Sequence, residues 1–146
     1  MFIRKAATHE VPILSRLRQS QLIDEGQTPN CNIDNEVESF LRRRIEDGSL
    51  IEWVAEDNGR IVATSAIVFY DFPPSFENPH GMRGYITNMY TAPDYRGRGL
   101  APILLDKLVD EAKARDVHII FLAASELGKP VYRKYGFSEA PEWMEL

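Results

Sequence analysis

The sequence predicts one α/β domain with a mixed, mostly antiparallel sheet flanked by helices. Two strand-like runs, 50–56 and 61–70, are joined by a turn containing Asn58-Gly59. An Asn-Gly pair between such runs indicates a hairpin, because a type I′ turn needs positive φ at both central residues. Later, strand-like runs at 85–91 and 118–123 enclose a helical run, and a strand–helix–strand connection makes its two strands parallel. The sheet therefore mixes antiparallel and parallel pairs.

Length and composition agree with this fold class. The 146 residues fit a single domain at 1–146 with a sizeable core, and 44% hydrophobic with 27% charged residues is ordinary for a soluble protein. No run approaches the ~20 apolar residues that a membrane span needs, so we expect a cytoplasmic protein with no membrane partner. The net charge of -5 argues against a nucleic-acid partner.

The first half is expected to form a strand, two helices and the hairpin. Val11, Leu14 and Leu17 recur at helical spacing and mark a core-facing stripe. The elements before the hairpin are a strand at 2–6, a helix capped by Thr8 that runs to about 21, a polar loop at 24–30, and a helix from about 34 that stops at Gly48.

The second half alternates strands and helices. Residues 71–81 contain three prolines and read as a long loop of the kind that borders binding clefts. The later elements are a strand at 85–91, a helix at 100–116 with Pro102 in its first turn, a strand at 118–123, a helix at 126–135 capped by Ser125 and closed by Gly136, and an edge strand at 137–146.

The stretch from Tyr85 to Ala101 is the strongest candidate for a site. A strand leads into a loop with Gly97 and Gly99, and a helix begins at once, so free N–H groups and the positive helix end converge where an anion could bind. Arg96 and Arg98 add positive charge. The two common phosphate-loop motifs are absent, and glycine-rich turns of this kind also occur for packing alone.

The charge distribution and the reactive side chains indicate less about function than this loop does. Residues 1–73 carry 12 acidic and 8 basic side chains, against 10 and 9 in residues 74–146, which favours a cationic substrate or else a solvated acidic face. Cys31 is the only cysteine and reads as a bystander, so no intrachain disulfide can form. The three histidines lack ligand-like spacing, so no metal site is expected.

A second motif, Tyr132-x-x-x-Gly136-Phe137, follows Arg96-x-x-Gly99-x-Ala101 with a strand between them. This pair of motifs resembles the GNAT superfamily of acyl-CoA-dependent N-acetyltransferases, and the resemblance covers the whole chain in element order. It implies a GNAT-like fold, acetyl-CoA as cosubstrate, no metal, and a primary amine of a small molecule or peptide as acceptor. It also leaves a homodimer open as the assembly.

The resemblance further implies roles for individual residues. Tyr132 would donate a proton to the departing CoA thiolate as general acid, and the central strand would splay from the next one, with Met89 or its neighbour near the thioester carbonyl. Ser125 stands where the family often has an asparagine, which puts one cofactor contact in doubt. The residues implied to contact acetyl-CoA are Met89, Tyr90, Thr91, Arg96, Gly97, Arg98, Gly99, Leu100, Ala101 and Ser125.

Three alternatives stay open at this point. The chain could be an enzyme, a non-catalytic CoA-binding sensor or interaction module of the same fold, or a generic nucleotide-binding α/β domain, which the hairpin disfavours. Tyr132 could be only a packed aromatic, and Tyr135 is expected to be core. The sequence does not identify the general base. The candidates are Glu25, Asp71, His80 and Glu126, or an ordered water.

Overall fold

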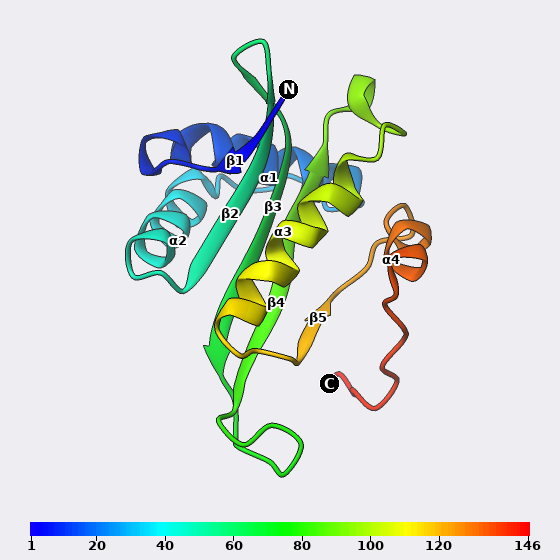
Figure 1. Ribbon diagram of the computed structural model, residues 1–146. Coiled ribbons are helices and arrows are strands. Elements are labelled where there is room, and N and C mark those ends of the chain that lie inside the picture. The colour runs from blue at the N-terminus through cyan, green and yellow to red at the C-terminus, as the bar shows by residue number, and fades with distance from the viewer.

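The computed structural model describes residues 1–146 as a sheet with helices on both faces (Figure 1). Its elements in chain order are β1 (Phe2–Lys5), the 3₁₀ turn η1 (Thr8–Glu10), α1 (Val11–Asp24), α2 (Asp34–Glu46), β2 (Leu50–Asp57), β3 (Arg60–Asp71), β4 (Met82–Thr91), the 3₁₀ turn η2 (Pro93–Tyr95), α3 (Leu100–Ala114), β5 (Ile120–Leu122) and α4 (Lys129–Tyr135).

The five strands lie in the order β1-β2-β3-β4-β5. The pairs β1–β2, β2–β3 and β3–β4 are antiparallel, whereas β4 and β5 are parallel. The predicted mixed sheet is therefore confirmed. The turn between β2 and β3 has φ 51° at Asn58 and 77° at Gly59, as a type I′ hairpin requires.

The helices form two layers around the sheet. Helices α1 and α2 cover one face, where they pack with Val54, Ala66 and Val68, while α3 covers the other face over Ile67 and Phe69 (Figure 1). Because alternate residues of β3 point to opposite faces, this strand is buried from Ile61 to Phe69. It is the centre of the core.

Strand β4 is distorted in its second half. Asn88 has φ 56°, and the register with β3 shifts at this point, which marks a bulge; the Thr64 hydroxyl donates to the Asn88 carbonyl at 2.7 Å and holds it. On the other side, pairing with β5 ends at Ile86–Leu122, although β4 continues to Thr91. The predicted splay between these strands is therefore present, and the β5-facing edge of 87–91 is not paired with β5.

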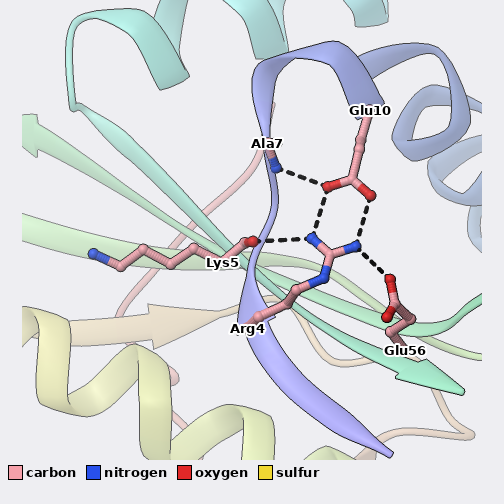
Figure 2. Close-up of polar contacts among 5 residues, drawn as sticks. All are labelled: Arg4, Lys5, Ala7, Glu10 and Glu56. Atoms are coloured by element: carbon pink, nitrogen blue, oxygen red, sulfur yellow. Dashed lines mark hydrogen bonds and ion pairs between the residues drawn. The ribbon is translucent and has the colours of Figure 1, made fainter. Parts of the chain in front are cut away.

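The start of α1 corrects one expectation. Thr8 is not the N-cap of a long helix: residues 8–10 form a 3₁₀ turn and α1 begins at Val11, because Pro12 lacks the N–H that a helix beginning at Thr8 would need there. Glu10 accepts the Ala7 N–H at 2.8 Å and pairs with both terminal nitrogens of Arg4, also at 2.8 Å (Figure 2). Arg4 also reaches Glu56 at 2.9 Å, so this network joins β1, η1 and β2.

The C-terminal segment corrects another. No strand forms over 137–146, so the expected sixth strand is absent. The segment contains Pro141, which has no N–H for a ladder, and it packs through side chains instead: the Trp143 ring stacks on Phe121 with centroids 6.3 Å apart. No helix is both long and apolar enough to cross a bilayer.

Candidate active site

A groove of about 810 Å³ lies where β4 and β5 diverge. Its walls come from the end of α1, the second half of β4, the loop into α3, the first turn of α3, and α4 with the turn before it. Apart from Arg98, all the site residues predicted from sequence line it, namely Met89, Tyr90, Thr91, Arg96, Gly97, Gly99, Leu100, Ala101, Ser125 and Tyr132.

The loop before α3 has the geometry of an anion cradle. Gly97 and Gly99 have φ 76° and 78°, the left-handed region that other residues rarely adopt. The N–H groups of Gly97, Arg98 and Gly99 donate no hydrogen bond within the protein, and the first N–H groups of α3 lack helical partners as at any helix start. A Cβ at either glycine would meet nothing within 4 Å, so the space in front of these donors is open. The residues present therefore fit a diphosphate.

The side chains of the two loop arginines both make contacts within the protein, so they are less available to an anion than the sequence suggested. The Arg96 side chain donates to the Thr91 carbonyl and to Asp24, both at 2.9 Å, and so ties the loop to β4 and to the end of α1. The Arg98 guanidinium lies 4.7 Å from the centre of the Tyr95 ring. Because Asp24 offsets the Arg96 charge, the partnerless backbone N–H groups are the donors that this loop leaves open to an anion.

Tyr132 faces the groove from α4. Its ring packs edge-on against Phe137 with centroids 6.0 Å apart, and a Cβ at Gly128 would approach its Cε2 atom to 2.7 Å, so the missing side chain at Gly128 makes room for the ring. The hydroxyl makes no hydrogen bond within the protein. Burial raises the pKa of Tyr132 to about 12, with a smaller contribution from Glu25. The phenol is therefore protonated at neutral pH and able to donate.

Two neighbours of Tyr132 hold α4 in place. The Ser125 hydroxyl accepts the Gly128 N–H at 3.2 Å and closes the turn before the helix, so Ser125 caps this turn although α4 itself begins at Lys129. Tyr135 donates to Asp106 of α3 at 2.7 Å and packs partly against the core while also lining the groove.

Of the four suggested bases, only Glu25 lines the groove. His80 is engaged elsewhere, because its Nε2 lies 2.7 Å from the Asp116 carbonyl and its Nδ1 accepts the Met82 N–H. Glu126 pairs with Lys129, which lowers its pKa. Asp71 is exposed at the end of β3 and lines neither this groove nor the second cavity.

Sequence reasoning missed a buried carboxyl, Glu52. It is 3% exposed on β2, accepts Asn88 Nδ2 at 3.0 Å through Oε1, and leaves Oε2 without a partner. Burial raises the pKa of Glu52 to about 8, against the opposing effects of Asn88 and Arg18. The alternation of Leu50, Glu52 and Val54 along one face was the signal that could have found it.

A second cavity, of about 540 Å³, lies on the α1–α2 face of the sheet. Thr87 and Asn88 line this cavity, and the next residues, Met89 to Thr91, line the groove, so the β4 bulge separates the two. Residues 71–81 line neither, so this loop does not border the groove as expected, and residues 137–146 line neither cavity. No group of three His, Cys, Asp or Glu side chains is placed to hold a metal ion.

Comparisons with known proteins agree with this geometry. Residues 17–137 match the model of the acetyltransferase (GNAT) family. A crystal structure of a predicted acetyltransferase with acetyl-CoA from Clostridium acetobutylicum is 50% identical, with a TM-score of 0.97 over 99% of this chain and 94% of that one. A GCN5-related N-acetyltransferase from Ralstonia eutropha JMP134 is 26% identical, with a TM-score of 0.91 over 99% and 97%.

A curated relative is more distant. The glucosamine 6-phosphate N-acetyltransferase of Trypanosoma brucei brucei is 29% identical over 91 residues, which cover 62% of this chain and 60% of the relative. The family match, in contrast, extends from α1 to the end of the Tyr132 motif and includes the loop before α3. The chain therefore belongs to the GNAT family of acyl-CoA-dependent N-acetyltransferases.

Proposed function

We propose that this protein transfers an acetyl group from acetyl-CoA directly to a primary amine of a small molecule or peptide, with Tyr132 as the general acid. The observation that carries the proposal is the presence, in one groove, of a loop of partnerless N–H groups and a protonated tyrosine hydroxyl. The 50% identical neighbour that was crystallised with acetyl-CoA supports the choice of cosubstrate. We take residues 1–146 as one N-acetyltransferase domain.

The residues of the groove would share the work of binding. The loop from Arg96 to Ala101 would hold the diphosphate through its backbone N–H groups. The β5-facing edge of Met89, Tyr90 and Thr91, which lacks a strand partner, would offer backbone groups to the pantetheine arm and orient the thioester carbonyl. Ser125 keeps the turn before α4 in the conformation that presents Tyr132.

Acetyl-CoA would supply an activated acyl group, and Tyr132 would assist its transfer. As the amine nitrogen bonds to the acyl carbon and the carbon–sulfur bond breaks, the sulfur gains negative charge. A neutral phenol at that point donates its proton to the sulfur, and the proton that the nitrogen loses as the amide forms leaves to a base or water and finally restores the phenol. Because this interaction develops only during the reaction, it favours turnover and not ground-state binding.

The acceptor is expected to be a small molecule. Glucosamine 6-phosphate, the substrate in the name of the curated relative, is a small molecule with a primary amine. The second cavity adjoins the groove at the β4 bulge and provides a place from which an amine could approach. The amine must arrive unprotonated, and Glu25 is the one suggested base that lines the groove.

The test is thiol release from acetyl-CoA with a broad panel of primary amines. The proposal expects amine-dependent release and formation of the N-acetyl product by mass spectrometry. Binding of acetyl-CoA without any amine-dependent release would instead support a non-catalytic CoA-binding module.

A further inference from the structure

The second cavity has an aromatic floor and a charged rim. Val68, Tyr70, Tyr85 and Phe121 of the sheet line it from below; Tyr85 and Phe121 meet edge-on with centroids 5.5 Å apart. Helix α2 lines it from above. A volume of about 540 Å³ is in the range of small-molecule sites, which combine an apolar lining with a few polar groups.

Arg18 projects to this cavity from α1 without an acidic partner. Its contacts are long and to neutral oxygens: 3.4 Å from Nη1 to the Thr87 hydroxyl and 3.5 Å to the Gln21 side-chain oxygen. No carboxylate lies within 4.0 Å of its nitrogens. Arg18 makes no hydrogen bond or ion pair with the buried Glu52 carboxyl and acts on it only at longer range, and burial raises the pKa of that carboxyl to about 8. The Arg18 charge is therefore available to an anionic ligand in the cavity.

Arg44 projects to the same cavity from α2. Its Nε is buried without a hydrogen-bond partner, and its guanidinium lies 5.6 Å from the centre of the Phe40 ring, which also lines the cavity. Arg44 has no ion pair. Glu36 is the one acidic side chain in the lining and pairs with neither arginine. Two unpaired guanidinium groups thus face one cavity, and guanidinium groups bind carboxylate and phosphate oxygens in a bidentate manner.

Resting on the proposed function, we propose that this cavity is the acceptor site and that the acceptor amine also carries an oxyanion, a carboxylate or a phosphate, which Arg18 and Arg44 bind. The amine would point to the β4 bulge, the wall that the cavity shares with the groove, while the body of the acceptor rests on the aromatic floor. The acidic excess of residues 1–73, which favoured a cationic substrate, does not decide the matter, because charges farther than about 8 Å are screened in physiological salt.

The test compares amines with and without the oxyanion, with each kcat/KM corrected for the fraction of the amine that is unprotonated at the assay pH. One pair is glucosamine 6-phosphate and glucosamine, and the other is phenylalanine and phenylalaninamide. We expect kcat/KM for the anionic member of at least one pair to exceed that of its neutral partner by about 10-fold or more, as a charged hydrogen bond would give. Arg18→Met and Arg44→Met should each reduce this ratio by about 10-fold. The pair that shows the preference identifies the oxyanion as phosphate or carboxylate.

The matched control is Arg43→Met. Arg43 lies beside Arg44 on α2, is exposed and does not line the cavity, so this variant makes the same change in net charge and should keep the wild-type ratio. Equal kcat/KM within both pairs, or a ratio that survives both cavity substitutions, would overturn the inference while leaving amine acetylation intact.

Calorimetry separates this inference from the proposed function. The same four amines are titrated into the CoA-bound protein, which needs no turnover. Absence of thiol release with every amine would refute the proposed function alone, if the anionic amines still bind more tightly and Arg18→Met or Arg44→Met removes that advantage. Absence of any anion-dependent binding refutes the acceptor-site inference whether or not thiol is released.

Discussion

Replacing Gly99 by valine should remove the stabilisation that acetyl-CoA gives the folded protein. Gly99 is the N-cap of α3, with φ 78° and open space where a Cβ would lie. A branched side chain at this position would enter the space in front of the partnerless N–H groups of the loop. The expected result is a protein that folds but does not bind the diphosphate.

The magnitude follows from linkage and strain. At a ligand concentration of 100 times Kd, binding stabilises the native state by about 2.7 kcal/mol. For a chain of this size, about 2–4 °C of Tm corresponds to 1 kcal/mol, so the wild type should gain roughly 5–10 °C. The left-handed conformation costs a non-glycine residue about 1–2 kcal/mol, so the variant without ligand should melt about 2–8 °C lower.

Gly48 supplies a matched control, measured by thermal denaturation with and without acetyl-CoA. It has φ 79°, and a Cβ there also meets nothing within 4 Å, but it follows α2 and does not line the groove. Gly48→Val should therefore carry the same strain and keep the full shift with acetyl-CoA. An undiminished shift in Gly99→Val, or equal loss in both variants, would refute the assignment of the loop to the cosubstrate.

Three further predictions concern side chains that the structure pairs or buries. Glu52 binds a proton more tightly when folded, so stability should fall as pH rises from about 4.5 to about 8, with a slope of up to about 1.4 kcal/mol per unit, and Glu52→Gln should flatten this slope in denaturant titrations. Pairing with Arg4 lowers the pKa of Glu10 to about 2, so the stabilisation is complete above the ordinary value near 4.5 and is lost as pH falls through about 2. Glu10→Gln should therefore cost about 1–2 kcal/mol at pH 7 and almost nothing near pH 2. Gly128→Ala should displace the Tyr132 ring and lower kcat in the thiol-release assay, because its Cβ would lie 2.7 Å from Cε2.

Each of these has a clear contrary result. A pH–stability profile that is the same for wild type and Glu52→Gln would show that this carboxyl is not protonated in the folded state. A Glu10→Gln defect that persists undiminished at pH 2 would mean that the charge pair is not its cause. Wild-type kcat in Gly128→Ala would show that the ring tolerates the methyl group without moving.

The sequence predicted the parts of the fold that short-range chemistry determines. Asn58-Gly59 can form few turns other than type I′, and Gly97 and Gly99 mark positive φ before a helix, so the hairpin and the loop followed from local pattern. The prediction that Thr8 caps the first helix was wrong, because the nearby Pro12 sets where α1 can begin. The strand predicted over 137–146 does not form, because no neighbouring strand is hydrogen-bonded to this segment. Its Trp143 packs through the ring instead.

The proposed acceptor cavity depends on long-range packing and was harder to predict. Arg18 and Arg44 lie on two helices, and nothing in their local sequence shows that both face Tyr85 and Phe121 across one cavity. Glu52 was visible only as a break in an apolar alternation. Its proximity to Asn88 depends on how β2, β3 and β4 are registered and on the bulge.

The central claim is tested most directly by kcat of Tyr132→Phe, measured with the acetyl-CoA-induced Tm shift in the same preparation. Phenylalanine keeps the ring against Phe137 and Gly128 but removes the proton donor. The account predicts that kcat for thiol release falls by about 10²- to 10⁴-fold while the Tm shift stays at the wild-type value. An unchanged kcat would contradict it and would leave Tyr132 as a packing residue of α4.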